Sequence, residues 1–168
     1  MSDVIRTLTR PELDTMLDWA AAEGWNPGRH DADACFATDA DGFIGLDVDG
    51  ELAVTLSVVR YDATFGFVGF YICRPELRGR GLGMELFEAG LARGDVVTLG
   101  LDGVLEQESN YARDGFVTAH HSVRYGGTID VPAPGGDDLR TLGIGDLDAL
   151  VTFERAHQVF PVPRPAFL

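Results

Sequence analysis

Apolar positions along this chain follow two periods, and each period predicts a type of element. Residues 4–8 alternate between apolar and polar side chains, which is typical of a short strand. The apolar residues between Leu13 and Ala20 recur every three or four positions, and this spacing predicts a helix over about 11–23. Glycine at position 24 and the turn residues after it end that helix, so the chain opens with a strand followed by a helix.

A run of strands is predicted next. Two segments rich in valine, leucine and threonine, 43–48 and 51–61, are separated only by an Asp-Gly pair, which is a strong signal for an antiparallel hairpin. A third strand is predicted over 65–73. Its interior Gly69 indicates a bulge or a close backbone approach. These segments predict three consecutive antiparallel strands.

The second half of the domain alternates between the two periods. The pattern predicts a helix ending at Gly94, a strand over 96–101, a short helix over 105–113 and a strand over 116–125. The order of elements is therefore βα, a meander of three strands, then αβαβ. Such a mixture favours an α/β (α+β) fold with one mixed sheet over a doubly wound parallel sheet.

Charge excludes several classes of function. The chain has 168 residues, 27 acidic and 13 basic, and a net charge of -14, so we expect no nucleic acid and no membrane as partner, whereas a cationic small molecule is favoured. All 13 basic residues are arginine. The lack of lysine excludes a P-loop lysine and a Schiff-base lysine. Short apolar stretches and a start without a basic or apolar leader predict a cytoplasmic protein.

A glycine-rich loop precedes the helix that ends at Gly94. Residues 78–83 read Arg-Gly-Arg-Gly-Leu-Gly between a predicted strand and that helix. Backbone N–H groups at a helix N-terminus favour an anion, and glycines let it approach closely. The glycine spacing departs by one position from the dinucleotide fingerprint. We therefore expect an anion site of another kind.

The loop fits the pattern R/Q-x-x-G-x-G/A, and here the chain resembles the GNAT superfamily of N-acetyltransferases over roughly residues 4 to 125. The strand before the loop, Tyr71 to Arg78, also resembles that family, as does Tyr111, which stands four residues before Gly115-Phe116. Two motifs at this separation are more specific than either alone. The resemblance implies a mostly antiparallel sheet with a splayed strand pair that forms a coenzyme A cleft, and acetyl-CoA as co-substrate with no metal.

The resemblance also implies functional residues. Tyr111 is the expected proton donor to the departing thiolate, with packing beneath the loop as the alternative. The region near Trp25, Asn26, Asp31 and Asp33 is expected to border a small amine acceptor, although aspartates in an acidic chain are commonly solvated surface. The expected cofactor-binding residues are Ile72, Cys73, Arg78, Gly79, Arg80, Gly81, Leu82, Gly83, Met84 and Asn110.

Two departures from the family pattern keep a second function open. Residues 65–66, near the start of the strand that often carries a glutamate as general base, contain no carboxylate, and the positions seven and four residues before Tyr111 are Val104 and Gln107. The main hypothesis is acetyl transfer to a primary amine. The alternative is a non-catalytic module that binds or senses coenzyme A.

The C-terminal part contains a repeat. Residues 139–148 match residues 5–14 at a constant offset of 134, with five identical positions. Residues 18–28 also resemble a GNAT subgroup with two related domains. We therefore expect a GNAT-like domain over 1–131, a Pro/Gly linker over 132–138, and the strand and helix of an incomplete second copy over 139–168. Such a tail cannot form a core alone, so it should dock on the first domain or form a homodimer. Coincidence between two strand-to-helix openings is the other interpretation of the repeat.

Overall fold

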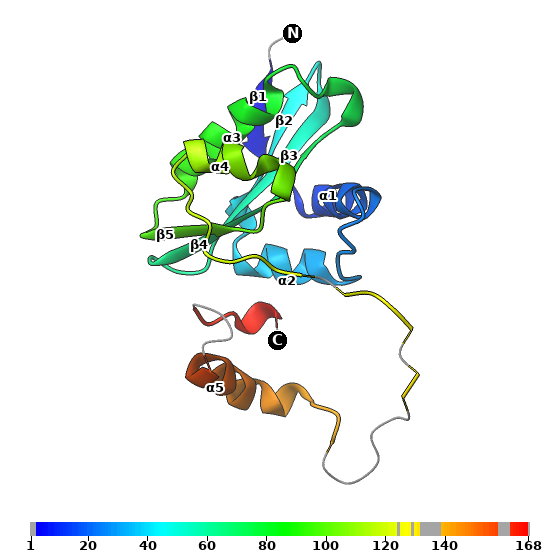
Figure 1. Cartoon of the computed structure of the whole chain (residues 1–168), viewed down its shortest axis with the longest axis vertical. Helices are drawn as coiled ribbons and strands as arrows, with labels where there is room; N and C mark the ends of the chain where they lie inside the picture. Colours follow the sequence, from blue (N-terminus) through cyan, green and yellow to red (C-terminus); the bar gives the residue numbers. More distant parts are fainter. Residues whose placement is uncertain (1–2, 124, 129, 132–138, 158–161, 168) are drawn as a thin grey trace.

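The centre of the sheet is an antiparallel meander. We describe a computed structural model, which covers residues 3–123, 125–128, 130–131, 139–157 and 162–167. Within these residues the sheet order is β1-β2-β3-β4-β5, with only the β4–β5 pair parallel (Figure 1). This mixed, mostly antiparallel sheet confirms the predicted fold class. The strands are β1 (Val4–Thr7), β2 (Phe43–Val48), β3 (Glu51–Arg60), β4 (Phe65–Cys73) and β5 (Thr98–Leu101).

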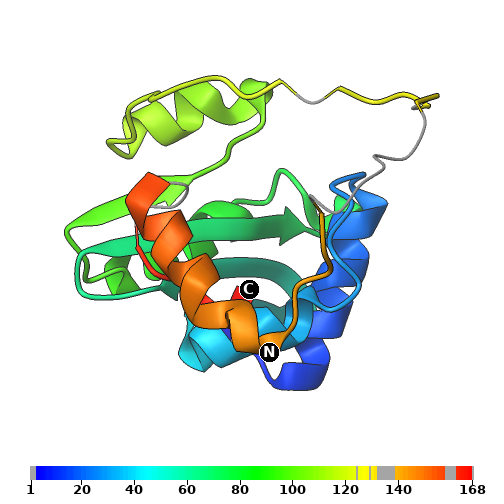
Figure 2. The same ribbon diagram turned by 90° about the horizontal axis from the view of Figure 1, so that it is seen from below.

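Helices cover both faces of the sheet. Helices α1 and α2 pack on one face, and α3 packs on the other (Figures 1 and 2). The α-helices are α1 (Arg10–Ala22), α2 (Asp31–Thr38), α3 (Leu82–Arg93), α4 (Glu108–Arg113) and α5 (Leu147–His157). Short 3-10 helices are η1 (Ala40–Gly42), η2 (Pro75–Leu77), η3 (Leu105–Gln107), η4 (Ile144–Asp146) and η5 (Pro165–Phe167).

Helix α3 packs closely on β3 through the larger core cluster. Leu86 and Phe87 of α3 are buried against Val54, Leu56 and other apolar side chains of the central strands. At Gly90 an added Cβ would lie 2.3 Å from Leu56 Cδ2, so only glycine allows this approach. The close contact fixes the helix, and therefore its N-terminus, relative to the end of β4.

An ionic contact fixes α1 to the sheet. The Glu12 carboxylate accepts from the Thr9 backbone N–H (2.7 Å) and pairs with Arg6 Nη2 (2.6 Å), while Arg6 Nε reaches Asp47 Oδ2 on β2 (2.7 Å). The glutamate three residues after Thr9 is the helix-start signal known from capping boxes. We call Arg6, Glu12 and Asp47 the N-terminal clamp.

Two local predictions were wrong. The connection that contains Asp31 and Asp33 forms helix α2, because Ala32 and Cys35 have the spacing of one helix face and are buried. The described residues of 116–125 are not a strand, and Val117 and Val123 are 89% and 69% exposed. Alternating β-branched residues favour extended backbone, but a strand also needs a neighbour with which to pair.

The tail repeats the start of α1 in three dimensions. Arg140 Nη2 pairs with Asp146 Oδ1 (2.5 Å), and Asp146 accepts from the Gly143 backbone N–H (2.9 Å), as Glu12 does from Thr9. Helix α5 follows as expected. Residues 139–143 do not form the expected strand, and the expected linker 132–138 lies outside the described residues.

The end of the tail contacts the first domain. Element η5 lies beside α2 (Figures 1 and 2), and Val162 is buried. Arg164, directly before η5, pairs with Glu154 of α5 (2.8 Å). The docking expected for the tail is therefore seen for η5.

Candidate active site

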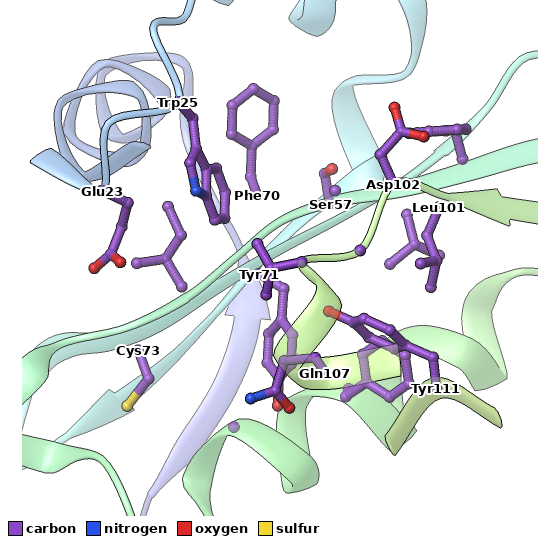
Figure 3. Close-up of a pocket in the computed structure, with 18 of the residues that line it drawn as sticks. Glu23, Trp25, Ser57, Phe70, Tyr71, Cys73, Leu101, Asp102, Gln107 and Tyr111 are labelled. Carbon is purple, nitrogen blue, oxygen red and sulfur yellow. The ribbon is translucent and has the colours of Figure 1, made fainter. Parts of the chain in front are cut away.

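A cleft of about 960 Å³ opens where β4 extends beyond β5 (Figure 3). The parallel pairing ends at Val68 and Leu101, whereas β4 continues to Cys73. The β4 edge from Gly69 to Cys73 therefore has no partner from β5. The opposite wall is formed by the chain that follows β5 and by helix α4.

A bulge in β4 shapes the floor of the cleft. Ser57 pairs with Gly69 and Thr55 pairs with Ile72, so Phe70 and Tyr71 together lie opposite one residue of β3. This places the predicted bulge directly after Gly69. Phe70 has a left-handed backbone (φ 46°), and the Thr55 hydroxyl, which is fully buried, donates to its carbonyl oxygen at 3.0 Å.

The bulge also changes which side chains face the cleft. Phe70 packs with the cluster under α1 and α2, whereas Tyr71 packs with Phe87 of α3 across the sheet. Burial raises the pKa of Tyr71 to about 12, so its hydroxyl stays protonated. That hydroxyl lies 2.6 Å from the position of a Cβ at Gly83, so a larger residue there would collide with it.

The N-terminus of α3 forms one end of the cleft. Gly81 has φ 86°, a conformation that favours glycine, and Gly81 to Met84 all line the cleft. The first N–H groups of a helix have no intrahelical acceptor and favour an anion. Arg78 stabilises this end, because its Nε donates to the Cys73 carbonyl at 2.9 Å and its guanidinium pairs with Glu23.

Tyr111 stands on the α4 side of the cleft. Its ring packs against Phe87 and Phe116, with centroid distances of 5.8 and 6.3 Å, and its hydroxyl points into the cleft in Figure 3. Burial raises the pKa of the Tyr111 hydroxyl, so this group holds its proton at neutral pH. Packing and a proton-donor role are therefore both compatible with its position.

Most of the residues predicted from the sequence lie together in this cleft. They are Trp25, Asp31, Ile72, Cys73, Arg78, Gly79, Gly81, Leu82, Gly83, Met84 and Tyr111.

Four predicted residues do not line the cleft. Asp33 pairs with Arg10 (2.8 Å) and is 79% exposed, and Asn110 is hydrogen-bonded to Gln107 and Arg113. Arg80 is exposed, and Asn26 lies in a left-handed turn outside the cleft wall. None of these side chains reaches the cleft in this structure.

Sequence reasoning missed several residues of the cleft wall. Ser57 lies on β3, Phe70 lies at the bulge, and Asp102 directly follows β5. A carboxylate directly after a short paired strand forms no sequence motif, so no local signal identifies Asp102. The β4–β5 register brings it to the cleft.

The described ranges have neither a metal-binding cluster nor a membrane-spanning helix. They contain no group of three or more His, Cys, Asp or Glu side chains placed to hold a metal ion. They also contain no helix with the length and apolar character needed to cross a bilayer.

Comparison with known proteins identifies the fold. No family model matches the chain. A curated relative, the holothin acyltransferase of a Pseudoalteromonas strain, is 32% identical over 157 residues, which are 94% of this chain and 53% of the relative. The chain therefore spans about half the length of that relative.

Solved structures agree in architecture. An acetyltransferase assigned to the GNAT family from Xanthomonas campestris superposes with a TM-score of 0.58 at 22% identity, over 74% of this chain and 94% of that chain. A predicted acetyltransferase from Clostridium acetobutylicum, solved with acetyl-CoA, gives 0.57 at 11% identity, over 74% and 96%. Together with the sheet order and the cleft, these matches show that the chain has the fold of the GNAT acetyltransferases.

Proposed function

We propose that this chain transfers an acetyl group from acetyl-CoA to the primary amine of a small acceptor. The observation that carries the proposal is the unpaired β4 edge from Gly69 to Cys73, which leads directly to the N-terminus of α3. One groove thus offers backbone groups for an amide-containing arm and a helix N-terminus for a pyrophosphate. The likeness to acetyltransferases, including one solved with acetyl-CoA, supports this assignment.

The cofactor has one orientation that suits this groove. Its pyrophosphate would bind the N–H groups of the Gly81–Met84 turn, and the two amides of its pantetheine arm would pair with the β4 edge beside Ile72 and Cys73. The thioester then lies towards Phe70, at the bulge. Backbone groups freed there are available to the carbonyl oxygen as negative charge develops on it.

The chemistry requires little beyond placement. A neutral amine attacks the thioester carbonyl carbon, the C–S bond breaks, and the departing sulfur takes a proton. Tyr111 is suited to supply that proton, because its hydroxyl is protonated and faces the cleft. No covalent enzyme intermediate is needed, so Cys73 serves as part of the wall.

Acidic and aromatic groups favour a cationic acceptor. Trp25 and Phe70 line the cleft, together with Asp31 and Asp102. Aromatic faces and carboxylates both attract an ammonium group. The net charge of -14 raises the local concentration of such an acceptor.

Calorimetry and thiol release test this function together. We expect the chain to bind acetyl-CoA and to release coenzyme A thiol in the presence of spermidine, tryptamine or holothin, the last taken from the name of the relative. Binding without amine-dependent release would favour the sensing alternative. A chain with no affinity for acetyl-CoA would overturn both.

We further propose that residues 139–168 are the beginning of a second copy of the β1–α1 unit. The Arg140–Asp146 contact, which repeats Arg6–Glu12, supports this, as does a relative about twice as long as the match. Helix α5 would then pack on the sheet of the second copy, and Leu150 would lie on the helix face that contacts this sheet. Leu150→Asp should lower binding of a hydrophobic dye without lowering the unfolding midpoint.

Light scattering tests whether the chain forms a homodimer, and a monomeric mass in solution would exclude one.

A further inference from the structure

We infer that Asp102 is the general base that accepts the proton of the attacking amine. This inference rests on the proposed acetyl transfer and assigns the group that the family pattern leaves unassigned, since residues 65–66 carry no carboxylate. It depends on where the strands diverge and on which carboxylates of the cleft already have a partner.

Among the described residues three carboxylates line the cleft, and two of them have a partner. Glu23 forms an ion pair with Arg78. Asp31 accepts a hydrogen bond from the Gly28 backbone N–H at 2.8 Å. Within the described part of the chain, no hydrogen bond or ion pair involves Asp102, and its side chain is exposed to the cleft. Its carboxylate is therefore available to a ligand.

The strand register places Asp102 beside the expected reaction centre. Leu101 is the last residue of β5 and pairs with Val68, so Asp102 leaves the sheet at the point where the β4 edge becomes free. An arm that runs along β4 from Cys73 towards Gly69 brings its thioester to this same point. Figure 3 shows Cys73 at one end of the cleft and Asp102 beside Ser57 at the other.

Asp102 and Tyr111 come from different parts of the chain, and both line the cleft. Figure 3 shows Tyr111 on the α4 side and Asp102 beyond it, next to Ser57 of β3. Ser57 lines the cleft beside Gly69 and is only 3% exposed; a Cβ added at Gly69 would lie 3.3 Å from Ser57 Oγ. The amine can therefore approach the carbonyl between a carboxylate and a hydroxyl, while Tyr111 serves the sulfur.

The proton balance is complete. The amine nitrogen forms a bond to the carbonyl carbon, and its proton passes to Asp102. The C–S bond breaks, and the sulfur takes the proton of the Tyr111 hydroxyl. Asp102 then returns its proton through water to Tyr111, so the net change is one N–H proton moved to the thiol.

The test uses the 168-residue chain and whichever of spermidine or tryptamine it acetylates faster. We expect Asp102→Asn to lower kcat about 100-fold or more, with unchanged affinity for acetyl-CoA by calorimetry. Asp102→Ala should be equally slow, and added formate should restore part of its rate by supplying the missing base. The matched control is Asp95→Asn, an exposed aspartate before the other end of β5 and outside this cleft.

The possible outcomes distinguish the role of Asp102 from the proposed function. An active wild type with a wild-type rate in Asp102→Asn overturns the inference and leaves the proposed function intact. Loss of rate without formate rescue, accompanied by loss of acetyl-CoA affinity, assigns Asp102 to structure and also overturns it. A wild type without amine-dependent thiol release overturns the proposed function, and this inference with it.

Discussion

Replacing Glu12 by glutamine should destabilise the domain, whereas the equivalent change in the tail should not. The pKa of the Glu12 carboxyl is lowered from 4.5 to about 2, mainly by the Arg6 guanidinium and also by hydrogen bonds from Thr9. Glutamine keeps the shape and can still accept from Thr9 but removes the charge. Asp146→Asn is the matched control, because Arg140 is 67% exposed and pairs with no second carboxylate among the described residues, whereas Arg6 also pairs with Asp47.

The size of the effect follows from linkage between protonation and folding. A lowering from 4.5 to about 2 corresponds to about 3 kcal/mol of stability at neutral pH. The Glu12 and Arg6 side chains are 28% and 34% exposed, so water screens the pair, and we expect about 1–2 kcal/mol.

Urea unfolding at several pH values measures this contribution. A carboxyl whose pKa is lowered by folding stabilises fully above pH 4.5, and the contribution is lost as the pH falls towards 2. The wild type should therefore lose this increment between those values, and Glu12→Gln should not. Equal stability of the wild type and Glu12→Gln at pH 7, or equal losses from Glu12→Gln and Asp146→Asn, would refute the reasoning.

Three further substitutions test the cleft and the core. Gly81→Asp should weaken acetyl-CoA binding about tenfold or more by calorimetry, because it places a carboxylate and a strained backbone (φ 86°) at the phosphate position; Gly126→Asp, in open surroundings, is the control. Tyr111→Phe should lower kcat about 100-fold with unchanged acetyl-CoA affinity, and a wild-type rate would assign the ring to packing. Gly90→Ala should cost about 1–3 kcal/mol in urea unfolding, because its Cβ would meet Leu56 at 2.3 Å; an unchanged midpoint would contradict the close packing of α3.

Local sequence signals predicted the elements whose causes are local. The Asp-Gly turn, with φ of 54° and 87°, suits the twist of a hairpin whatever surrounds it. The bulge near Gly69 was also predicted. The left-handed conformation is adopted by Phe70, however, and the residue type of Phe70 does not predict it. The Phe70 carbonyl accepts a hydrogen bond from Thr55, which lies fifteen positions away in the sequence.

The prediction of the site from the sequence was limited mainly by the unknown directions of the side chains. The family pattern correctly placed the glycine loop beside a cleft, since backbone geometry follows the glycines. It also included Asn110, which is instead bonded to its helical neighbours, and omitted Asp102, which the β4–β5 register brings in. Neither the hydrogen bonds of Asn110 nor the position of Asp102 beside the cleft can be derived from spacing along the chain.

The short length of β5 has a consequence for how the cleft opens. This strand has four residues and none is fully buried, whereas β3 has seven buried residues and partners on both sides. Its detachment exposes little apolar surface and leaves the centre of the sheet intact, so local opening there costs much less than global unfolding. Amide hydrogens of Leu99 and Leu101 should exchange well before that of Leu56. The wall that carries Asp102 can therefore open locally, which would widen the cleft while the central strands stay paired.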